Sequence, residues 1–365
     1  MNLISLDVSR KIKILGLLLI ILIVYLHASY PTSEVACKSV QRMQTAFGIF
    51  GRLGVPFFFL ISGFLFFRHG FSDYGRKILK RVRTLLIPYL IATIAAYMIY
   101  LALYYLSGSH PDILRLVSEY NLDIYTSLKG EAWIRLHFIE CNVNFPLWFV
   151  RDLMVLCLVS PLIYFIVKGL VRYNWLLIIY FGVALWALWY FRASYTEEQA
   201  IVFFTCGAIL AVHPGFDIGK KYKIFGLACL IITAVVSVAC FIPGMGFIKG
   251  NEIVVIPIGL LGLWYGYDFF VERWRKVVQK GKFVNLRMGD ILEEASAYSF
   301  FIFIFHEPLL ALLRRYTLLL GNSNVFYTLC YLLMPIVIIA FLMGIGWLLR
   351  RFLPHVYSFI TGNRG

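Results

Sequence analysis

A small set of ionisable side chains lies inside otherwise apolar stretches of the sequence. They are His27, Arg52, Arg151, Asp152, Asp268, His306 and Glu307. A neutral histidine near its reference pKa can take a proton from a hydroxyl group. An arginine can stabilise an oxyanion that develops in a poorly hydrated site, and a carboxylate can orient an imidazole. These residue types in such surroundings therefore suit acid–base chemistry.

The candidates divide into two roles. Those expected to carry the chemistry are His27, His306 and Glu307. Those expected to position substrate or stabilise an oxyanion are Arg52, Arg151 and Asp152. A structural alternative stays open, in which Arg151 pairs with Asp152 or Glu307 and the histidines only form hydrogen bonds between helices.

The depth of these residues favours the functional interpretation. With a rise of about 1.5 Å per residue, all of them except Asp268 fall at similar depth in their segments. Asp268 falls near the inner end of its segment. An ionisable group inside a membrane costs about 3 kcal/mol unless it is paired or hydrated. We therefore expect the set to line one polar cavity that opens outward.

A second candidate site is the basic run from Arg76 to Arg83, which leads into the apolar segment LLIPYL. One interpretation is that the run only holds the end of a membrane span in the cytoplasm. The other is that it binds the phosphates of a donor, because guanidinium and ammonium groups suit phosphate. The residues of the run expected at this donor site are Lys80, Arg81 and Arg83.

The cysteines and histidines show no metal-binding spacing such as CxxC or HExxH, so we expect no metal and no permanently bound cofactor. Five of the seven cysteines lie in apolar segments and are expected to be small core residues. Cys37 and Cys141 are both expected outside, where they could pair in an oxidising compartment.

The composition of the 365 residues identifies the elements that must position these groups. The chain is 61% hydrophobic and only 15% charged, with a mean hydropathy of +0.81. These values exclude a soluble globular domain, intrinsic disorder and collagen. The net charge of +15 lies mainly in short connecting segments, as it does in membrane proteins. The expected partner is therefore a lipid bilayer and not nucleic acid.

The apolar windows predict an all-α, polytopic membrane protein with about ten transmembrane helices. The expected spans are 12–30, 46–67, 84–106, 146–168, 174–191, 199–213, 223–242, 252–270, 297–314 and 325–349. Lys and Arg are concentrated in the segments that are cytoplasmic if both termini lie inside, which predicts an N-in, C-in orientation. The first segment is interpreted as a permanent span, since no cleavage site follows it. One transmembrane domain over 1–365, with no appended soluble domain, is expected.

Several segments, in order, resemble acyltransferase family 3, a family of polytopic membrane proteins that O-acylate cell-envelope carbohydrates. They are IVYLHAS, GRLGVPFFFLISGFLFF, KRVRTLLIPYL, PLWFVRDLMVLCLVSPLIY, FFTCGAIL, SFFIFIFHEPLL and LPHVYSFITGNR. The resemblance implies that His27 is the essential first-span histidine and that Lys80, Arg81 and Arg83 form the basic motif. The family places an arginine eleven positions before that histidine, and here this position is Gly16.

Lys13 or Arg10, earlier in the same segment, could take over the role of the missing arginine. The hydrolase-like domain that some family members carry is absent from this sequence. One chain is then expected either to complete the transfer or to pass the acyl group to a partner.

The resemblance implies the transfer of an acyl group, with acetyl as the default, from cytoplasmic acyl-CoA to a hydroxyl of an extracytoplasmic or lipid-linked glycan. The expected location is the bacterial cytoplasmic (inner) membrane. Whether His27 acts as a base or carries the acyl group stays open. A proton-coupled secondary transporter or flippase is the alternative, although the sequence shows no inverted repeat. A scaffold without chemistry would leave the ionisable residues in the spans unexplained.

Overall fold

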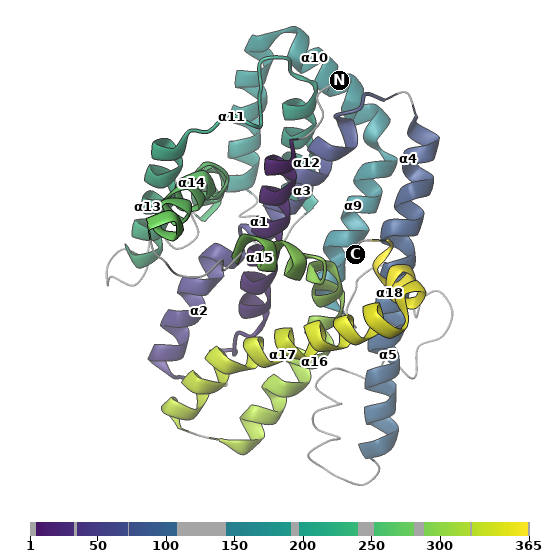
Figure 1. Ribbon diagram of the computed structural model, residues 1–365, viewed down its shortest axis with the longest axis vertical. Coiled ribbons are helices and arrows are strands. Elements are labelled where there is room, and N and C mark those ends of the chain that lie inside the picture. Colours follow the sequence, from purple (N-terminus) through teal and green to yellow (C-terminus); the bar gives the residue numbers. More distant parts are fainter. Residues whose placement is uncertain are drawn as a thin grey trace. The chain divides into compact units, whose positions relative to one another are not determined.

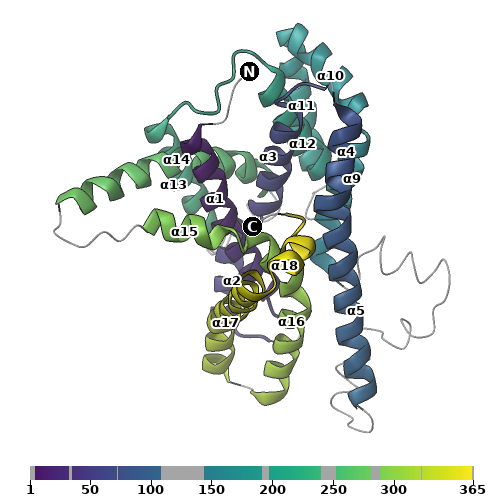
Figure 2. The same ribbon diagram turned by 45° about the vertical axis from the view of Figure 1, so that its right-hand side comes forward.

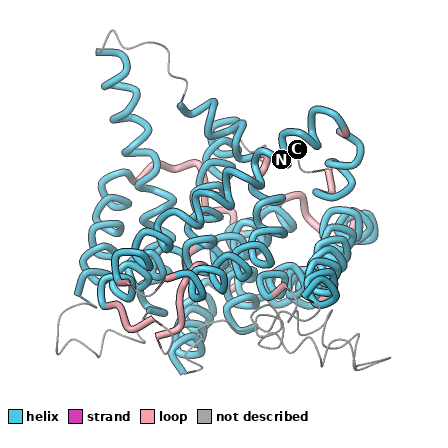
Figure 3. The backbone as a smooth tube through the Cα atoms, turned by 90° about the horizontal axis from the view of Figure 1, so that it is seen from below, coloured by secondary structure: helices cyan, strands magenta, loops and turns pink. Residues whose placement is uncertain are grey.

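The computed structural model describes residues 5–32, 35–71, 73–107, 144–190, 197–239, 252–280, 288–321 and 323–363. Within these ranges all regular secondary structure is helical, and no strand occurs (Figure 3). The chain forms two compact units, which are described separately. The first comprises Met1–Leu26, Arg42–Lys77 and Val155–Ala297, and the second comprises His27–Gln41, Ile78–Met154 and Tyr298–Gly365.

Helices of the first unit pack closely through glycines. The helices that lie wholly in this unit are α3 (Gly54–Phe67), α10 (Ser160–Arg172), α11 (Asn174–Tyr190), α12 (Glu197–Val212), α13 (Lys223–Ala239), α14 (Glu252–Lys280) and α15 (Met288–Ser296). A Cβ on Gly63 of α3 would lie 2.1 Å from the Phe204 carbonyl oxygen of α12, and one on Gly207 would lie 2.0 Å from the Leu60 carbonyl oxygen. Only glycine allows the two backbones to approach this closely, as is common between membrane helices.

The start of α1 (Leu6–His27) is anchored in the first unit by a buried ion pair. The Nζ atom of Lys11 lies 2.7 Å from Oδ2 of Asp268 on α14, and the two side chains are 5% and 10% exposed. The same Nζ atom lies 4.3 Å from the centroid of the Trp264 ring. Asp268, expected at the inner end of its span, therefore has a buried partner.

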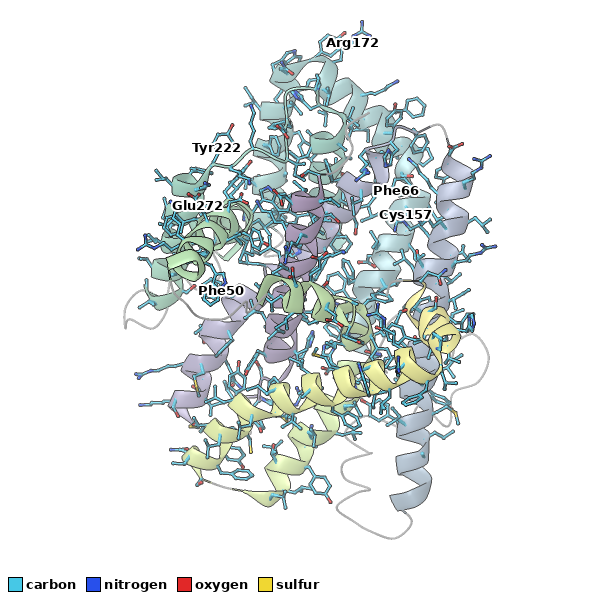
Figure 4. The ribbon with its side chains drawn as sticks, in the orientation of Figure 1. Phe50, Phe66, Cys157, Arg172, Tyr222 and Glu272 are labelled. Atoms are coloured by element: carbon cyan, nitrogen blue, oxygen red, sulfur yellow. The ribbon has the colours of Figure 1, made fainter. Side chains whose placement is uncertain are left out.

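Several side chains of this unit are labelled in Figure 4. Figure 4 labels Tyr222, which precedes α13, and Glu272 on α14, which pairs with Lys223. It also labels Phe66 on α3 and Cys157 near the end of α9 (Trp148–Leu158).

The second unit is built around a helical hairpin. Its helices α16 (Ser299–Leu320) and α17 (Asn324–Phe352) lie side by side (Figures 1 and 2), and α18 (Pro354–Thr361) follows. The helix α5 (Ile87–Ser107) packs against α16 and α18. This unit also holds the first half of α9, which is preceded by the 3₁₀ turn η3 (Phe145–Leu147).

Prolines set the irregular points of the helices. A proline has no N–H, so the carbonyl four residues earlier loses its helical partner. Before Pro88, the helix α4 (Tyr74–Arg81) passes into the π-helical turn η1 (Val82–Leu86), in which the Ile87 N–H donates to the Val82 carbonyl. This wide turn carries the basic run into α5.

The fourth predicted span, 146–168, is not one straight helix. The segment Phe145–Leu158 and the helix α10 meet at an angle of 69°. Pro161 cannot bond to the Cys157 carbonyl, and the Ser160 hydroxyl donates to that carbonyl instead, at 2.7 Å. The proline therefore accounts for the break.

The described part of the chain contains three helices that are long and apolar enough to cross a membrane: Lys38–Phe67, Tyr74–Ala102 and Asn324–Phe352. The number rises to five if the bent pairs Phe145–Leu158 with Ser160–Arg172 and Gly289–Ser296 with Ser299–Leu320 each count as one span. This supports a membrane protein. The count of ten spans and the N-in, C-in orientation stay predictions.

Candidate active site

The three residues predicted to carry the chemistry meet in the second unit. His27 is the last residue of α1, and His306 and Glu307 lie on α16. The Nδ1 atom of His27 lies 3.8 Å from Oε2 of Glu307, and these side chains are 16% and 14% exposed. The ring centroids of His27 and His306 lie 5.4 Å apart with the planes at 53°. Two segments that are far apart in the sequence thus contribute to one imidazole–carboxylate cluster.

Arg314 fixes the position of His27. The Nη1 atom of Arg314 donates to the His27 carbonyl at 2.8 Å and to the Ser29 carbonyl at 3.3 Å. The last carbonyls of a helix lack helical partners and favour a nearby cation. Arg314 follows Glu307 by two helical turns and so shares its face of α16. One face of α16 therefore carries the carboxylate of Glu307 and also binds the backbone of His27 through Arg314.

A second contact joins the same segments. The hydroxyl groups of Tyr30 and Thr317 lie 2.6 Å apart. Helix α16 continues to Leu320, beyond the predicted end of its span at 314, and this extra turn carries Thr317. The loop that follows His27 is thus held along the outer part of α16.

His306 is fully buried and held by its own helix. Its Nδ1 atom lies 2.8 Å from the Phe303 carbonyl oxygen and 3.1 Å from that of Ile302. A carbonyl only accepts hydrogen bonds, so Nδ1 carries the proton. In the neutral ring Nε2 is then the basic nitrogen.

Asn144 ties the start of α9 to the same part of α16. Pro308 has no N–H, so the Ile304 carbonyl has no helical donor. The Asn144 Nδ2 atom donates to this carbonyl at 2.9 Å, and the side chain is almost completely buried. The next residue, Phe145, places its ring edge-on to His27 with the centroids 6.3 Å apart.

Neither Asn144 nor Arg314 was among the predicted site residues. Asn144 is not ionisable, and the amide alone gave no signal. Pro308 directly after the His306–Glu307 pair was the available signal, because it predicts an unfilled carbonyl. The sequence does not say which distant side chain fills it.

The predicted positioning residues are distributed over both units. Arg151 and Asp152 lie on α9 in the second unit, where Nε of Arg151 donates to Oδ1 of Asp152 at 2.7 Å. This is one of the pairings of the structural alternative. Arg52 lies in the first unit, in the turn between α2 (Lys38–Gly51) and α3. The roles of these three residues in substrate positioning stay predictions.

The predicted donor residues Lys80, Arg81 and Arg83 lie around the π-helical turn. Lys80 and Arg83 are exposed and Arg81 is half-buried. The C-terminal Gly362, with φ of 64°, packs on this turn, and a Cβ there would lie 2.6 Å from Cα of Thr84. The basic side chains thus project from a turn whose other side is covered by the end of the chain.

Lys13 lies in the first unit and has a carboxylate partner. Its Nζ atom is 3.0 Å from Oε1 of Glu293 on α15, and Nε of Arg10 is 3.3 Å from Oε2 of the same residue. At Gly16, a Cβ would lie 3.6 Å from the Phe58 ring. The position where the family has an arginine therefore faces α3.

Among the described residues, no group of three His, Cys, Asp or Glu side chains is placed to hold a metal ion. Cys37 is buried, and its sulfur lies 3.0 Å from the Ser39 hydroxyl. Cys141 lies outside the described residues, and so does the suggested pairing.

A comparison with protein families decides the family of this chain. The model of a family described as an acyltransferase domain matches residues 12–349. The chain belongs to acyltransferase family 3. This confirms the resemblance of the motifs within that range, whereas the terminal LPHVYSFITGNR segment lies entirely beyond it.

One curated relative of this family 3 acyltransferase is the succinoglycan biosynthesis protein ExoH of Rhizobium meliloti (strain 1021). It is 26% identical over 376 residues, which cover 98% of this chain and 93% of the relative. No solved structure matches. The comparisons support a membrane acyltransferase that modifies polysaccharide, and the matched range includes His27, His306 and Glu307.

Proposed function

We propose that this protein transfers an acyl group, by default acetyl, from cytoplasmic acyl-CoA to a hydroxyl of an extracytoplasmic or lipid-linked glycan. The observation that carries the proposal is the contact of His27 with Glu307 and His306 within a family 3 acyltransferase. The name of the relative, a succinoglycan biosynthesis protein, supports an envelope polysaccharide as acceptor. The proposed location is the bacterial cytoplasmic membrane.

His27 is the proposed general base. The carboxylate of Glu307 lies 3.8 Å from Nδ1, so a proton on Nδ1 faces a negative charge and Nε2 is left to accept. Nε2 takes the proton of the sugar hydroxyl as the hydroxyl oxygen bonds to the thioester carbonyl carbon. When the tetrahedral intermediate collapses, the C–S bond breaks. The leaving CoA sulfur then takes the proton from the imidazolium.

The developing oxyanion requires a donor or a cation, and Arg52 or Arg151 is proposed for this role. Asp152 bonds to Arg151 at 2.7 Å and would hold the guanidinium in place. A covalent acyl-imidazole on His27 is the other route to the same product.

The donor is proposed to bind at the basic turn. Lys80, Arg81 and Arg83 would contact the phosphates of acyl-CoA, because charge-assisted hydrogen bonds to phosphate are strong. Helix α5 continues from this turn and packs against α16, which carries two of the catalytic residues. Lys13 is proposed to replace the family arginine. It would then give up its ion pair with Glu293 and bind the donor instead.

The test uses purified protein in lipid nanodiscs with acetyl-CoA and fragments of the producing cell's envelope polysaccharide. The expected result is release of free CoA that depends on the acceptor, together with acetyl esters on the glycan detected by mass spectrometry. Loss of both signals in the His27→Gln protein is the matched control. In sealed proteoliposomes of the same protein, movement of a glycan or a proton across the membrane without CoA release would favour the transporter or flippase instead.

A further inference from the structure

Two side chains are held by the same turn of α16, and their orientations follow from what they bind. The Ile304 carbonyl accepts from Nδ2 of Asn144, and the Phe303 carbonyl accepts from Nδ1 of His306. Since a carbonyl has no proton to donate, the amide cannot be flipped and the imidazole cannot change tautomer without losing its bond. Oδ1 of Asn144 and Nε2 of His306 are therefore both acceptors.

These two acceptors have no hydrogen-bond partner within the described part of the chain. Both atoms are buried, and the same holds for Oε2 of Glu307, which faces His27 at 3.8 Å. Asn144 as a whole is 1% exposed. Buried polar atoms are nearly always hydrogen-bonded in folded proteins, so an unfilled one indicates a bound water or ligand. Oε2 of Glu307 is paired with His27, so the two unfilled acceptors are Oδ1 of Asn144 and Nε2 of His306.

Unfilled acceptor atoms favour a ligand that carries hydrogen-bond donors. The thioester of acyl-CoA offers none at its reacting end, because its oxygen and sulfur only accept. A sugar offers several hydroxyl groups. The hydroxyl that becomes acylated gives its only proton to the catalytic histidine. A hydrogen bond to Oδ1 of Asn144 therefore requires another hydroxyl.

We propose that Asn144 is a substrate-binding residue whose Oδ1 accepts a hydrogen bond from a sugar hydroxyl adjacent to the one that is acylated. The acceptor class is thus a sugar with two neighbouring hydroxyl groups. This inference rests on the proposed function. It adds that the buried atoms around Asn144 and His306 recognise the glycan and not acyl-CoA. Asn144 also keeps its link to Ile304, which fixes where Oδ1 points.

The variant must remove Oδ1 without leaving the Ile304 carbonyl unfilled. Asn144→Leu has nearly the same shape but lacks both polar atoms. Pro308→Ala restores the N–H that the Ile304 carbonyl lacks in α16. The double variant Asn144→Leu/Pro308→Ala is therefore compared with Pro308→Ala alone. The amounts of both proteins in the membrane are measured first.

The expected result is a ten- to hundredfold loss of kcat/KM for envelope-glycan fragments in the double variant, with the KM for acetyl-CoA unchanged. An unchanged kcat/KM for the glycan, or an equal change in the KM of both substrates, would overturn the role of Asn144. If the wild-type protein itself releases no CoA with the glycan, the proposed function fails and not only this inference.

A second measurement begins with the wild-type protein. Glycan fragments are partially O-methylated, offered to the wild-type protein as a mixed pool, and the acetylated products are mapped by tandem mass spectrometry. Products with a methyl ether beside the acetylated position should be depleted about tenfold or more, and Asn144→Leu/Pro308→Ala should lessen the depletion relative to Pro308→Ala. Equal use of methylated and free neighbours by the wild-type protein would overturn the proposal.

Discussion

The Nη1 atom of Arg314 lies 2.8 Å from the main-chain carbonyl oxygen of His27. The contact joins the end of α1 to the face of α16 that carries Glu307, so the distance between the imidazole and the carboxylate depends on it. Arg314 binds the backbone of His27 and is therefore a positioning residue.

Replacing Arg314 with Gln should lower kcat about tenfold or more while the KM for acyl-CoA stays the same. The charged hydrogen bond contributes about 1.5–3 kcal/mol, and its loss frees the end of α1. Arg315→Gln removes the same charge one position along α16, where it points to another face. Steady-state kinetics of the two proteins are compared. Equal losses in both would assign the effect to charge and not to the contact with His27.

Replacing Arg83 with Gln should raise the KM for acyl-CoA about ten- to hundredfold, because one charge-assisted hydrogen bond to phosphate is lost. Arg76→Gln, on the preceding helix α4, removes an exposed charge of the same basic run that is not among the residues proposed to contact the phosphates. The measurement is the acyl-CoA dependence of the rate at saturating glycan. If the two variants have the same KM as the wild type, the basic turn serves only membrane orientation.

Lys13 and Glu293 form a matched pair for testing the replacement of the family arginine. The pair is partly exposed, at 52% and 34%, and such pairs contribute about 0.2–1 kcal/mol to stability. If Lys13 binds the donor, Lys13→Ala raises the KM for acyl-CoA, whereas Glu293→Gln frees Lys13 and does not. The same KM change in both variants would show that the residues act only as an ion pair.

The catalytic candidates were predictable, but their supports were not. His27, His306 and Glu307 stand out because ionisable groups are costly in apolar segments, and the structure brings them together. Asn144 and Arg314 act by filling backbone carbonyls of other segments. That need arises only when distant helices pack, so no local pattern marks it.

The helix boundaries show the same division. Apolar windows found most of the helices, because helix length follows from the run of apolar residues. They missed the break before Pro161 and the π-helical turn before Pro88. Both prolines were visible in the sequence, but a proline in a membrane helix is compatible with a kink, a wide turn or no change, depending on which group fills the freed carbonyl.

The N-in, C-in orientation predicts that Asp73 and Arg273 face the cytoplasm. In a protein whose native cysteines are replaced, Asp73→Cys and Arg273→Cys should resist an impermeant thiol reagent in intact cells and react after lysis. Lys38→Cys, expected outside, is the positive control. Labelling of Asp73→Cys or Arg273→Cys from outside would reverse the orientation and the side from which the donor enters.

His306→Gln should reduce glycan acylation but retain part of it. The bond from Nδ1 to the Phe303 carbonyl orients only His306 itself, and Glu307 still faces His27 in this variant. Acylation of envelope glycans is measured by mass spectrometry at matched protein levels in the membrane. Complete loss in His306→Gln with normal turnover in His27→Gln would move the base to α16.

The role of His27 as the general base is tested most directly by the turnover of the His27→Gln protein. Gln keeps the size and the hydrogen bonds of a histidine but cannot take a proton, and general base catalysis contributes about 10²–10⁴-fold. If His27 is the general base, the variant has normal levels in the membrane, normal acyl-CoA binding and at least about a hundredfold loss of glycan acylation. Near-normal acylation by His27→Gln would contradict it.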